Sequence, residues 1–303
     1  MRDLFHICIF LFIATSTLMA QKLPTTNVFL FDLEKKTDSL YTFTNAKFLT
    51  AYNAEGYNNQ PSFISDNVIY LTTQMWYDTT QTDIYALDVN RRTKTRVTET
   101  IESEYSPTLI PFSGEDEPPM FSCVRVEADA ESTQRLWKFP IDRSNNGQPV
   151  FETITGVGYH AWMSPREVGL FIVGEPHQLI TAEPRSEGTT NITANIGRCL
   201  KKMPGGNIAF VHMLGETTWL IKKLNRTTYR PELITAALKG VEDFAVLPDG
   251  TFIMGKGSKL YKFNKLKDIG WLEIADFSRI NIQDITRLAI NPSANKIAIV
   301  SRQ

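Results

Sequence analysis

Cysteine and histidine are scarce, and the short motifs of several enzyme classes are missing. The 303-residue chain has three cysteines and four histidines, with no Cys-x-x-Cys spacing. Cysteine-based zinc sites need paired spacings or nearby histidines, so the sequence predicts no zinc centre. It also lacks a nucleophile elbow, a phosphate-binding loop and a His-Glu-x-x-His motif. The enzyme classes that these motifs define are therefore not predicted, and the sequence identifies no cofactor.

An excess of either charge is also missing. The chain has 32 lysines and arginines against 33 aspartates and glutamates, which gives a net charge of −1. Nucleic acids and anionic membrane surfaces are bound by strongly basic proteins, so neither is an expected partner. Hydrophobic residues make up 42% of the chain, which is typical of a soluble globular protein.

Long apolar runs are absent except at the N terminus. Arg2 precedes the apolar stretch Leu4–Ala14, and small residues lead up to Ala20. This stretch is shorter than the roughly 20 apolar residues that a membrane span needs. Residues 1–20 are therefore predicted to be a signal peptide cleaved after Ala20, with an uncleaved anchor as the alternative. We expect a periplasmic or secreted protein whose mature part, residues 21–303, is not inserted in a membrane.

A short strand–turn–strand motif with a polar turn, here called a phrase, recurs along the mature chain. Its clearest copy is Pro61–Thr73. Successive copies are about 40 to 53 residues apart, a spacing typical of four-stranded propeller blades. The residues just before the six turns are Ile64, Ile110, Met163, Met203, Leu247 and Ile290.

The two ends of the chain each lack part of a blade. Asn27–Leu33 and Leu40–Phe43 are predicted strands with no phrase before them, and Arg287–Val300 is a phrase with no strand pair after it. Joining them completes a sixth blade and leaves no open sheet edge. The sequence thus predicts one all-β domain, a six-bladed β-propeller closed by its N-terminal strands. Pro231–Lys239 is compatible with either a strand or a short helix.

The mature cysteines, Cys123 and Cys199, fall in the second and fourth repeats. Blades that are not neighbours do not bring their cysteines within disulfide distance. Two buried thiols without a disulfide are therefore expected.

These phrases resemble the repeat of TolB-like six-bladed propellers. The resemblance rests on Gly56–Phe63, on Thr82–Tyr85 and on the turns Leu247–Gly250 and Asn291–Ala294, and it extends over Asn27–Gln303. It implies a bacterial envelope setting and the propeller fold, but no particular activity, because propellers serve unrelated functions.

Propeller geometry places the start of each blade's first strand at the mouth of a central channel. A peptide, an envelope or secreted partner protein, or a small polar ligand is expected to bind there, to a monomeric chain. The rim loops add Trp76 and Tyr77, which either stack on a ligand or pack onto their own blade. Trp137, Trp162 and Trp219 are predicted to be core. The predicted ligand-binding residues are Gln60, Glu104, Tyr105, His160, Arg198, Asp243 and Arg287.

A hydrolase or lyase is the alternative, and the sequence alone does not decide it. In that case His160 would act as a general base oriented by Glu104 or Asp243, with an arginine steadying an anion. A lactonase-like calcium site would instead use Glu104, Asp243, Asn59 and His160. A third interpretation is that these polar groups simply pair with one another inside the channel.

Overall fold

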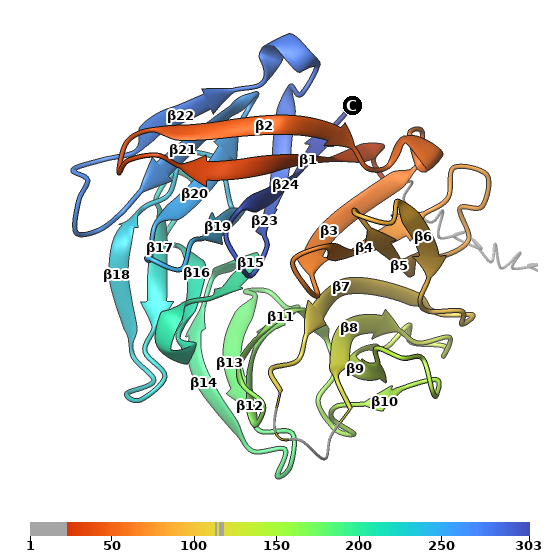
Figure 1. The fold of residues 1–303 in the computed structure, drawn as a ribbon. Coiled ribbons are helices and arrows are strands. Elements are labelled where there is room, and N and C mark those ends of the chain that lie inside the picture. Colours follow the sequence, from red (N-terminus) through yellow and green to blue (C-terminus); the bar gives the residue numbers. More distant parts are fainter. Residues whose placement is uncertain (1–22, 113, 115–117) are drawn as a thin grey trace, which may run out of the picture.

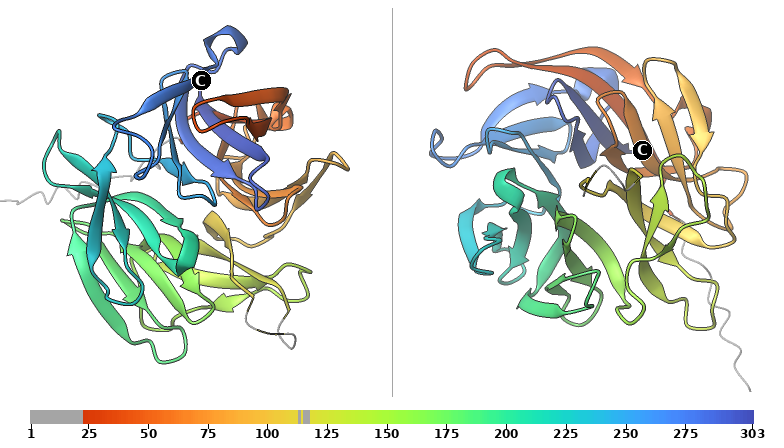
Figure 2. Two further views of the ribbon diagram at one scale, coloured as in Figure 1. Left: turned by 60° about the vertical axis from the view of Figure 1, so that its left-hand side comes forward. Right: turned by 60° about the horizontal axis from the view of Figure 1, so that its bottom comes forward.

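The computed structural model describes residues 23–112, 114 and 118–303, and the predicted signal peptide lies outside this part. Six four-stranded antiparallel sheets stand in a ring around a central axis, as Figures 1 and 2 show from three directions. The prediction of an all-β, six-bladed propeller is confirmed. Among the described residues, no helix is both long and apolar enough to cross a membrane.

Each blade runs from an innermost strand at the channel to an outermost strand at the surface. The innermost strands are β3 (Tyr57–Phe63), β7 (Ser103–Leu109), β11 (Val157–Ser164), β15 (Ile196–Lys202), β19 (Phe244–Val246) and β23 (Asp284–Ile290). The second strands are β4 (Val68–Gln74), β8 (Met120–Val126), β12 (Glu167–Ile172), β16 (Ile208–Met213), β20 (Phe252–Lys256) and β24 (Lys296–Arg302).

The third and fourth strands complete the sheets. The third strands are β5 (Asp83–Asp88), β9 (Gln134–Pro140), β13 (Gln178–Ala182), β17 (Trp219–Leu224), β21 (Lys259–Phe263) and β1 (Thr26–Lys35). The outermost strands are β6 (Thr93–Arg96), β10 (Gln148–Pro149), β14 (Thr189–Ala194), β18 (Pro231–Ala236), β22 (Leu272–Asp276) and β2 (Tyr41–Phe48). Short 3-10 turns are η1 (Ala51–Asn53), η2 (Pro204–Gly206) and η3 (Ser278–Ile280). Residues 231–236 are thus a strand, as one of the two interpretations predicted.

The last blade joins the two ends of the chain, as predicted. Its strand order is β2-β1-β24-β23, and β1 pairs with β24 from Thr26 opposite Arg302 to Asp32 opposite Lys296. Just beyond this ladder, the Gln303 backbone N–H donates a hydrogen bond to the Thr25 carbonyl oxygen over 3.2 Å. The N-terminal strands therefore supply the pairing that the C-terminal strands would otherwise lack.

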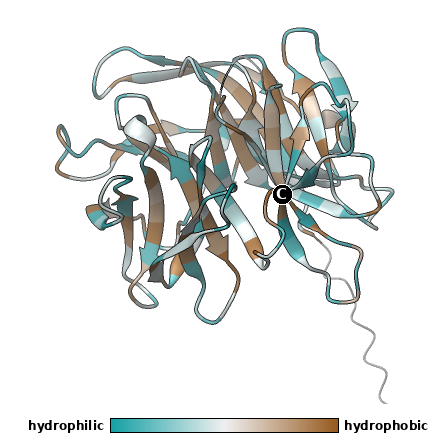
Figure 3. Ribbon diagram, turned by 90° about the horizontal axis from the view of Figure 1, so that it is seen from below, coloured by the Kyte–Doolittle hydropathy of each residue, from teal (hydrophilic) through white to brown (hydrophobic). Residues whose placement is uncertain are grey.

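Apolar side chains on both faces of the strands hold neighbouring blades together. Figure 3 shows hydrophobic residues along the strands and hydrophilic ones in the loops. Tyr70 of β4 meets Phe121 of the next blade edge to face, with ring centroids 5.0 Å apart. A Cβ on Gly169 would lie 2.5 Å from Ile208 of the neighbouring sheet, so the two sheets pack closely at this point because Gly169 has no side chain. Cys123 and Cys199 are free and buried, as expected.

Candidate functional site

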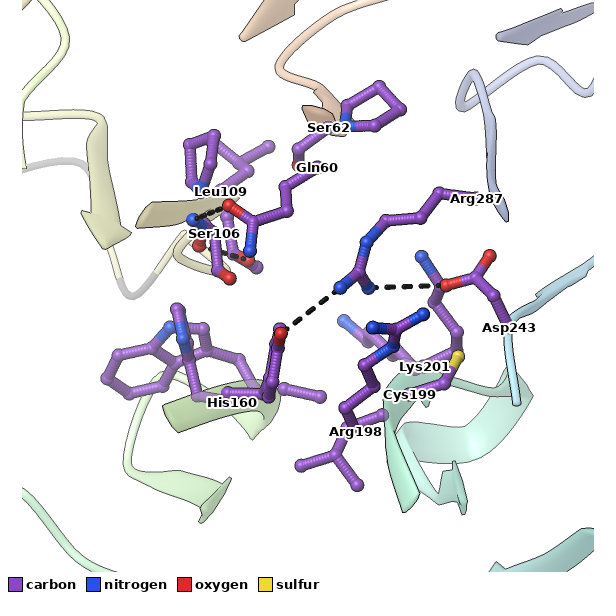
Figure 4. Close-up of a pocket in the computed structure, with 18 of the residues that line it drawn as sticks. Gln60, Ser62, Ser106, Leu109, His160, Arg198, Cys199, Lys201, Asp243 and Arg287 are labelled. Atoms are coloured by element: carbon purple, nitrogen blue, oxygen red, sulfur yellow. Dashed lines mark hydrogen bonds and ion pairs between the residues drawn. The ribbon is translucent and has the colours of Figure 1, made fainter. Parts of the chain in front are cut away.

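A cavity of about 330 Å³ occupies the central channel. Five of the six innermost strands contribute to its wall, namely β3, β7, β11, β15 and β23, and Asp243 enters it from the loop before β19. Five of the seven predicted ligand-binding residues line it, and Figure 4 shows them around one space. These residues are Gln60, His160, Arg198, Asp243 and Arg287.

The wall formed by β3 and β7 is neutral and contains an unusual backbone. Gln60 and Ser106 have φ angles of 53° and 56°, a left-handed conformation that costs a non-glycine residue about 1–3 kcal/mol. The strand register shifts at both places. Gln60 Oε1 accepts hydrogen bonds from Thr72 Oγ1 at 2.7 Å and from the Ser106 N–H at 2.9 Å. The same amide thus fixes two equivalent bulges in adjacent blades.

The opposite wall is charged. Arg287 donates from Nη2 to the Tyr159 hydroxyl at 3.1 Å, and its Nη1 lies 3.5 Å from Asp243 Oδ2 (Figure 4). Asp243 Oδ1 accepts the Leu288 N–H at 2.8 Å, which holds the carboxylate in place. The Arg287 side chain is only 10% exposed, yet these contacts engage two of its five N–H donors. The guanidinium therefore has capacity for a further acceptor.

Further cations share this wall. Arg198 is half-exposed, and its Nε lies 4.0 Å from Glu242 Oε2, beyond hydrogen-bonding distance. Lys201 donates from Nζ to the Leu288 carbonyl oxygen at 3.2 Å, and Lys202 also lines the cavity. Four cationic residues thus line the cavity together with one acidic residue, Asp243. An excess of positive charge in a partly desolvated channel is unfavourable unless an anion or water compensates it.

His160 is part of the wall but is not oriented as the catalytic interpretation expected. Its Nε2 lies 2.7 Å from Ser122 Oγ, which also accepts the Trp162 indole N–H at 2.9 Å. Ser122 Oγ also donates to the Thr108 carbonyl oxygen at 3.4 Å, so this hydroxyl ties His160 to two further groups. Burial lowers the pKa of His160 to about 3, so the ring is neutral at physiological pH. Within the described residues neither Glu104 nor Asp243 hydrogen-bonds to it.

Glu104 and Tyr105 do not belong to the channel lining, which corrects two predicted positions. Glu104 is completely buried between the first two blades, where Oε1 accepts bonds from Arg125 Nε at 3.2 Å and Thr100 Oγ1 at 2.5 Å. Burial raises the pKa of Glu104 to about 7. Tyr105 packs instead against the apolar cluster around Leu136 and Val157. Successive side chains of a strand point to different sides, so proximity to the strand start was insufficient evidence.

The expected calcium constellation is likewise not assembled. Glu104 is bonded to Arg125, His160 to Ser122 and Asp243 to Arg287. Across residues 23–112, 114 and 118–303, no group of three or more His, Cys, Asp or Glu side chains is arranged to hold a metal ion.

The residues that sequence reasoning missed are the paired lysines Lys201 and Lys202. They stand near the end of β15, whose register against β16 shifts between Ile196 and Leu200. Two adjacent lysines in an innermost strand were the available signal, because none of the other five innermost strands contains a lysine.

The aromatic pair on the rim is exposed rather than packed onto its blade. Trp76 is 56% and Tyr77 69% exposed, and their rings meet edge to face at 5.4 Å. The buried Asn53 fixes this loop by accepting the Trp76 N–H at 2.9 Å and donating to the Gln74 carbonyl oxygen at 2.9 Å. The loop therefore presents both rings from a defined backbone. Trp162 is buried, as predicted, whereas Trp137 and Trp219 are only partly buried.

Comparison with known proteins identifies the fold. No family model and no curated protein matches the sequence. Among solved structures, a putative TolB from Agrobacterium tumefaciens superposes with a TM-score of 0.64 at 9% identity, covering 93% of this chain and 99% of that one. TolB from Acinetobacter baumannii gives 0.56 at 11% identity, covering 91% and 64%. An oligogalacturonate lyase from Vibrio parahaemolyticus gives 0.56 at 14% identity, covering 86% and 83%. The chain therefore has the TolB-like six-bladed propeller fold.

Proposed function

We propose that this chain is an exported ligand-binding propeller that holds an anionic group in the mouth of its central channel. The observation that carries the proposal is the charge of the cavity, whose lining has four cationic residues and one carboxylate. The ligand is a small polar anion or an acidic group of a peptide or partner protein. The proposal of export rests on the signal-like residues 1–20.

The arrangement of donors favours a carboxylate or a similar planar anion. A guanidinium presents a planar fork of N–H groups that matches two oxygens of one anion. Arg287 is steadied from one side by Asp243 and from another by Tyr159, so little side-chain entropy is lost when a ligand binds. The rigid neutral wall opposite adds the amide of Gln60, together with the lining residues Ser62 and Thr108, as hydrogen-bonding groups for the rest of the ligand.

We propose binding in preference to catalysis because no base is well placed among the channel residues that the structure describes. His160 has a pKa near 3 and its Nε2 is bonded to Ser122, while Asp243 is engaged by Arg287 and a backbone N–H. Two distant structural neighbours are lyases by name. At such low identity this likeness supports only the shared fold, so it adds no weight to a reaction here.

Calorimetry with defined anions tests the proposal. Succinate, citrate and inorganic phosphate are titrated into the mature chain, residues 21–303, with glucose as the uncharged comparison. At least one anion is expected to bind and to raise the melting temperature, since ligand at about 100 times its Kd adds roughly 2.7 kcal/mol of stability.

Variants locate the site. Arg198→Gln and Lys201→Gln each remove a channel cation and are expected to weaken anion binding about tenfold or more, whereas Arg91→Gln, an exposed arginine in the turn between the outer strands β5 and β6, is the matched control. Binding that is equally weakened by the control, or absent for all three anions, would refute the proposal.

A further inference from the structure

The loops that surround the channel mouth carry the opposite charge to the channel. Eleven loops lie at this end, those joining each outermost strand to the next blade and those joining second to third strands. They contain twelve acidic residues but only two basic ones, Lys239 and Arg279, although the whole chain has a net charge of −1. Six of the exposed carboxylates, each in a different loop, are Glu55, Asp78, Glu99, Glu131, Glu175 and Glu216.

These six carboxylates are not neutralised locally. None forms an ion pair with another residue in the part of the chain that the structure describes. The rim therefore presents a negative field around a positive channel. A free anion approaching the channel from this end would have to cross that field, which lowers its local concentration and its rate of association.

The same loops also expose apolar side chains. Ile101 is 80% exposed, and large apolar residues stand out from four further loops at this end. They are Trp76 and Tyr77, Val173, Leu214 and Ile280. A small ligand held in the channel would not reach all of these loops. Apolar and aromatic residues spread around a rim, with Trp and Tyr among them, are instead what a protein interface uses as contact points.

We infer that the occupant of the channel is an acidic side chain or C-terminal carboxylate of a partner protein, whose surrounding surface is basic and contacts the rim. This inference rests on the proposed function and identifies the ligand class for that site. Basic residues beside the acidic tip make the interaction between the partner and the negatively charged rim attractive rather than repulsive. The acidic tip then meets the guanidinium of Arg287 and the neighbouring cations.

Three cyclic peptides test the inference. Each has a turn with one residue at its tip and two flanking residues on each side. The first peptide has an aspartate tip with lysine flanks, and the second has an aspartate tip with glutamate flanks. The third has an asparagine tip with lysine flanks. Fluorescence anisotropy measures their Kd at 50 and 300 mM salt. The lysine-flanked aspartate peptide is expected to bind at least tenfold more tightly than either comparison, with a smaller difference at 300 mM salt because rim charges are screened.

A matched pair of variants assigns the effect to the rim. Glu131→Gln with Glu216→Gln removes two exposed rim carboxylates and is expected to reduce the preference for lysine flanks several-fold. Asp142→Asn with Glu183→Gln removes two exposed carboxylates at the opposite end and is expected to leave it unchanged.

The outcomes separate the inference from the proposed function. Equal affinity for the two aspartate peptides, while succinate or citrate still binds in an Arg198-dependent way, would overturn the basic-partner inference alone. Failure of every anion and every peptide would overturn both. Equal loss in the rim variant and its control would also overturn the inference, because the rim would then have no specific role.

Discussion

Two buried ion pairs begin from similar places in the repeat and lie in different environments. Glu104, near the start of β7, bonds to Arg125 at 3.2 Å, and Asp243, just before β19, lies 3.5 Å from Arg287. The first pair is sealed between blades, with Arg125 stacked 3.9 Å from the Trp137 ring centroid. The second faces the channel cavity. The same kinds of residue thus stabilise an interface in one case and form a candidate binding site in the other.

The difference shows that exposure to the channel, rather than the presence of a charge pair, identifies the candidate site. A sealed pair has its partners fixed and gains nothing from a ligand. A pair at the wall of a cavity keeps unused donors that a ligand can satisfy. Four expectations test this contrast, from the largest effect to the smallest.

Removing the arginine should be most harmful in the sealed pair. Arg125→Met leaves Glu104 buried without its cation, and breaking a buried pair in this way costs about 3–5 kcal/mol. Arg287→Met should cost less, because Asp243 keeps its bond to the Leu288 N–H and faces a cavity that admits water. Urea denaturation of both variants compares the losses. Equal losses would mean that the channel does not relieve the second pair.

Protonation of His160 should limit stability in acid. Its pKa is about 3 in the folded state against an ordinary value of 6.5, so its contribution is complete above pH 6.5 and is lost as the pH falls toward 3. The slope over this window is about 1.4 kcal/mol per pH unit for one proton. His160→Gln should flatten the acid side of the stability curve by that amount. An unchanged slope would show that the ring is solvated and charged.

Glu104 should act in the opposite direction over an overlapping window. Its pKa is raised to about 7 from 4.5, so the folded state retains a proton that the unfolded state releases. Stability from this group therefore falls as the pH rises from 4.5 to 7 and is constant above that range. In Glu104→Gln this decrease in the free energy of unfolding, a few kcal/mol between pH 4.5 and 7, should be absent. Asp243→Asn is the comparison variant at the channel. Denaturation midpoints at pH 5, 6 and 7 measure it.

The smallest effect on folding is expected at the rim of the channel. Arg198 is half-exposed and its side chain makes no close ion pair, so Arg198→Gln should change stability by less than about 0.5 kcal/mol. The affinity of the Arg198→Gln variant for anions should nevertheless fall. A large loss of stability here would place Arg198 with the structural residues and remove it from the candidate site.

The sequence predicted the blades because their signal is local and repeated. Each phrase has a polar turn just after Ile64 or an equivalent residue, and the unmatched strands at both ends required a shared blade. The direction of individual side chains was less predictable. A register shift in β15 interrupts the alternation that would have placed Lys201 from spacing alone. Glu104 was misplaced because nothing in its own segment reveals Arg125, which lies 21 residues further along.

The shared blade also has a mechanical consequence. The ladder between β1 and β24 starts at Thr26 opposite Arg302, so the two chain ends leave the sheet side by side. A force that pulls these ends apart would act on the hydrogen bond nearest the termini first and on each next one in turn, as in opening a zip. The force needed to separate β1 from β24 would therefore be low. The ring would open between these two strands before any of the five blades built from consecutive strands came apart.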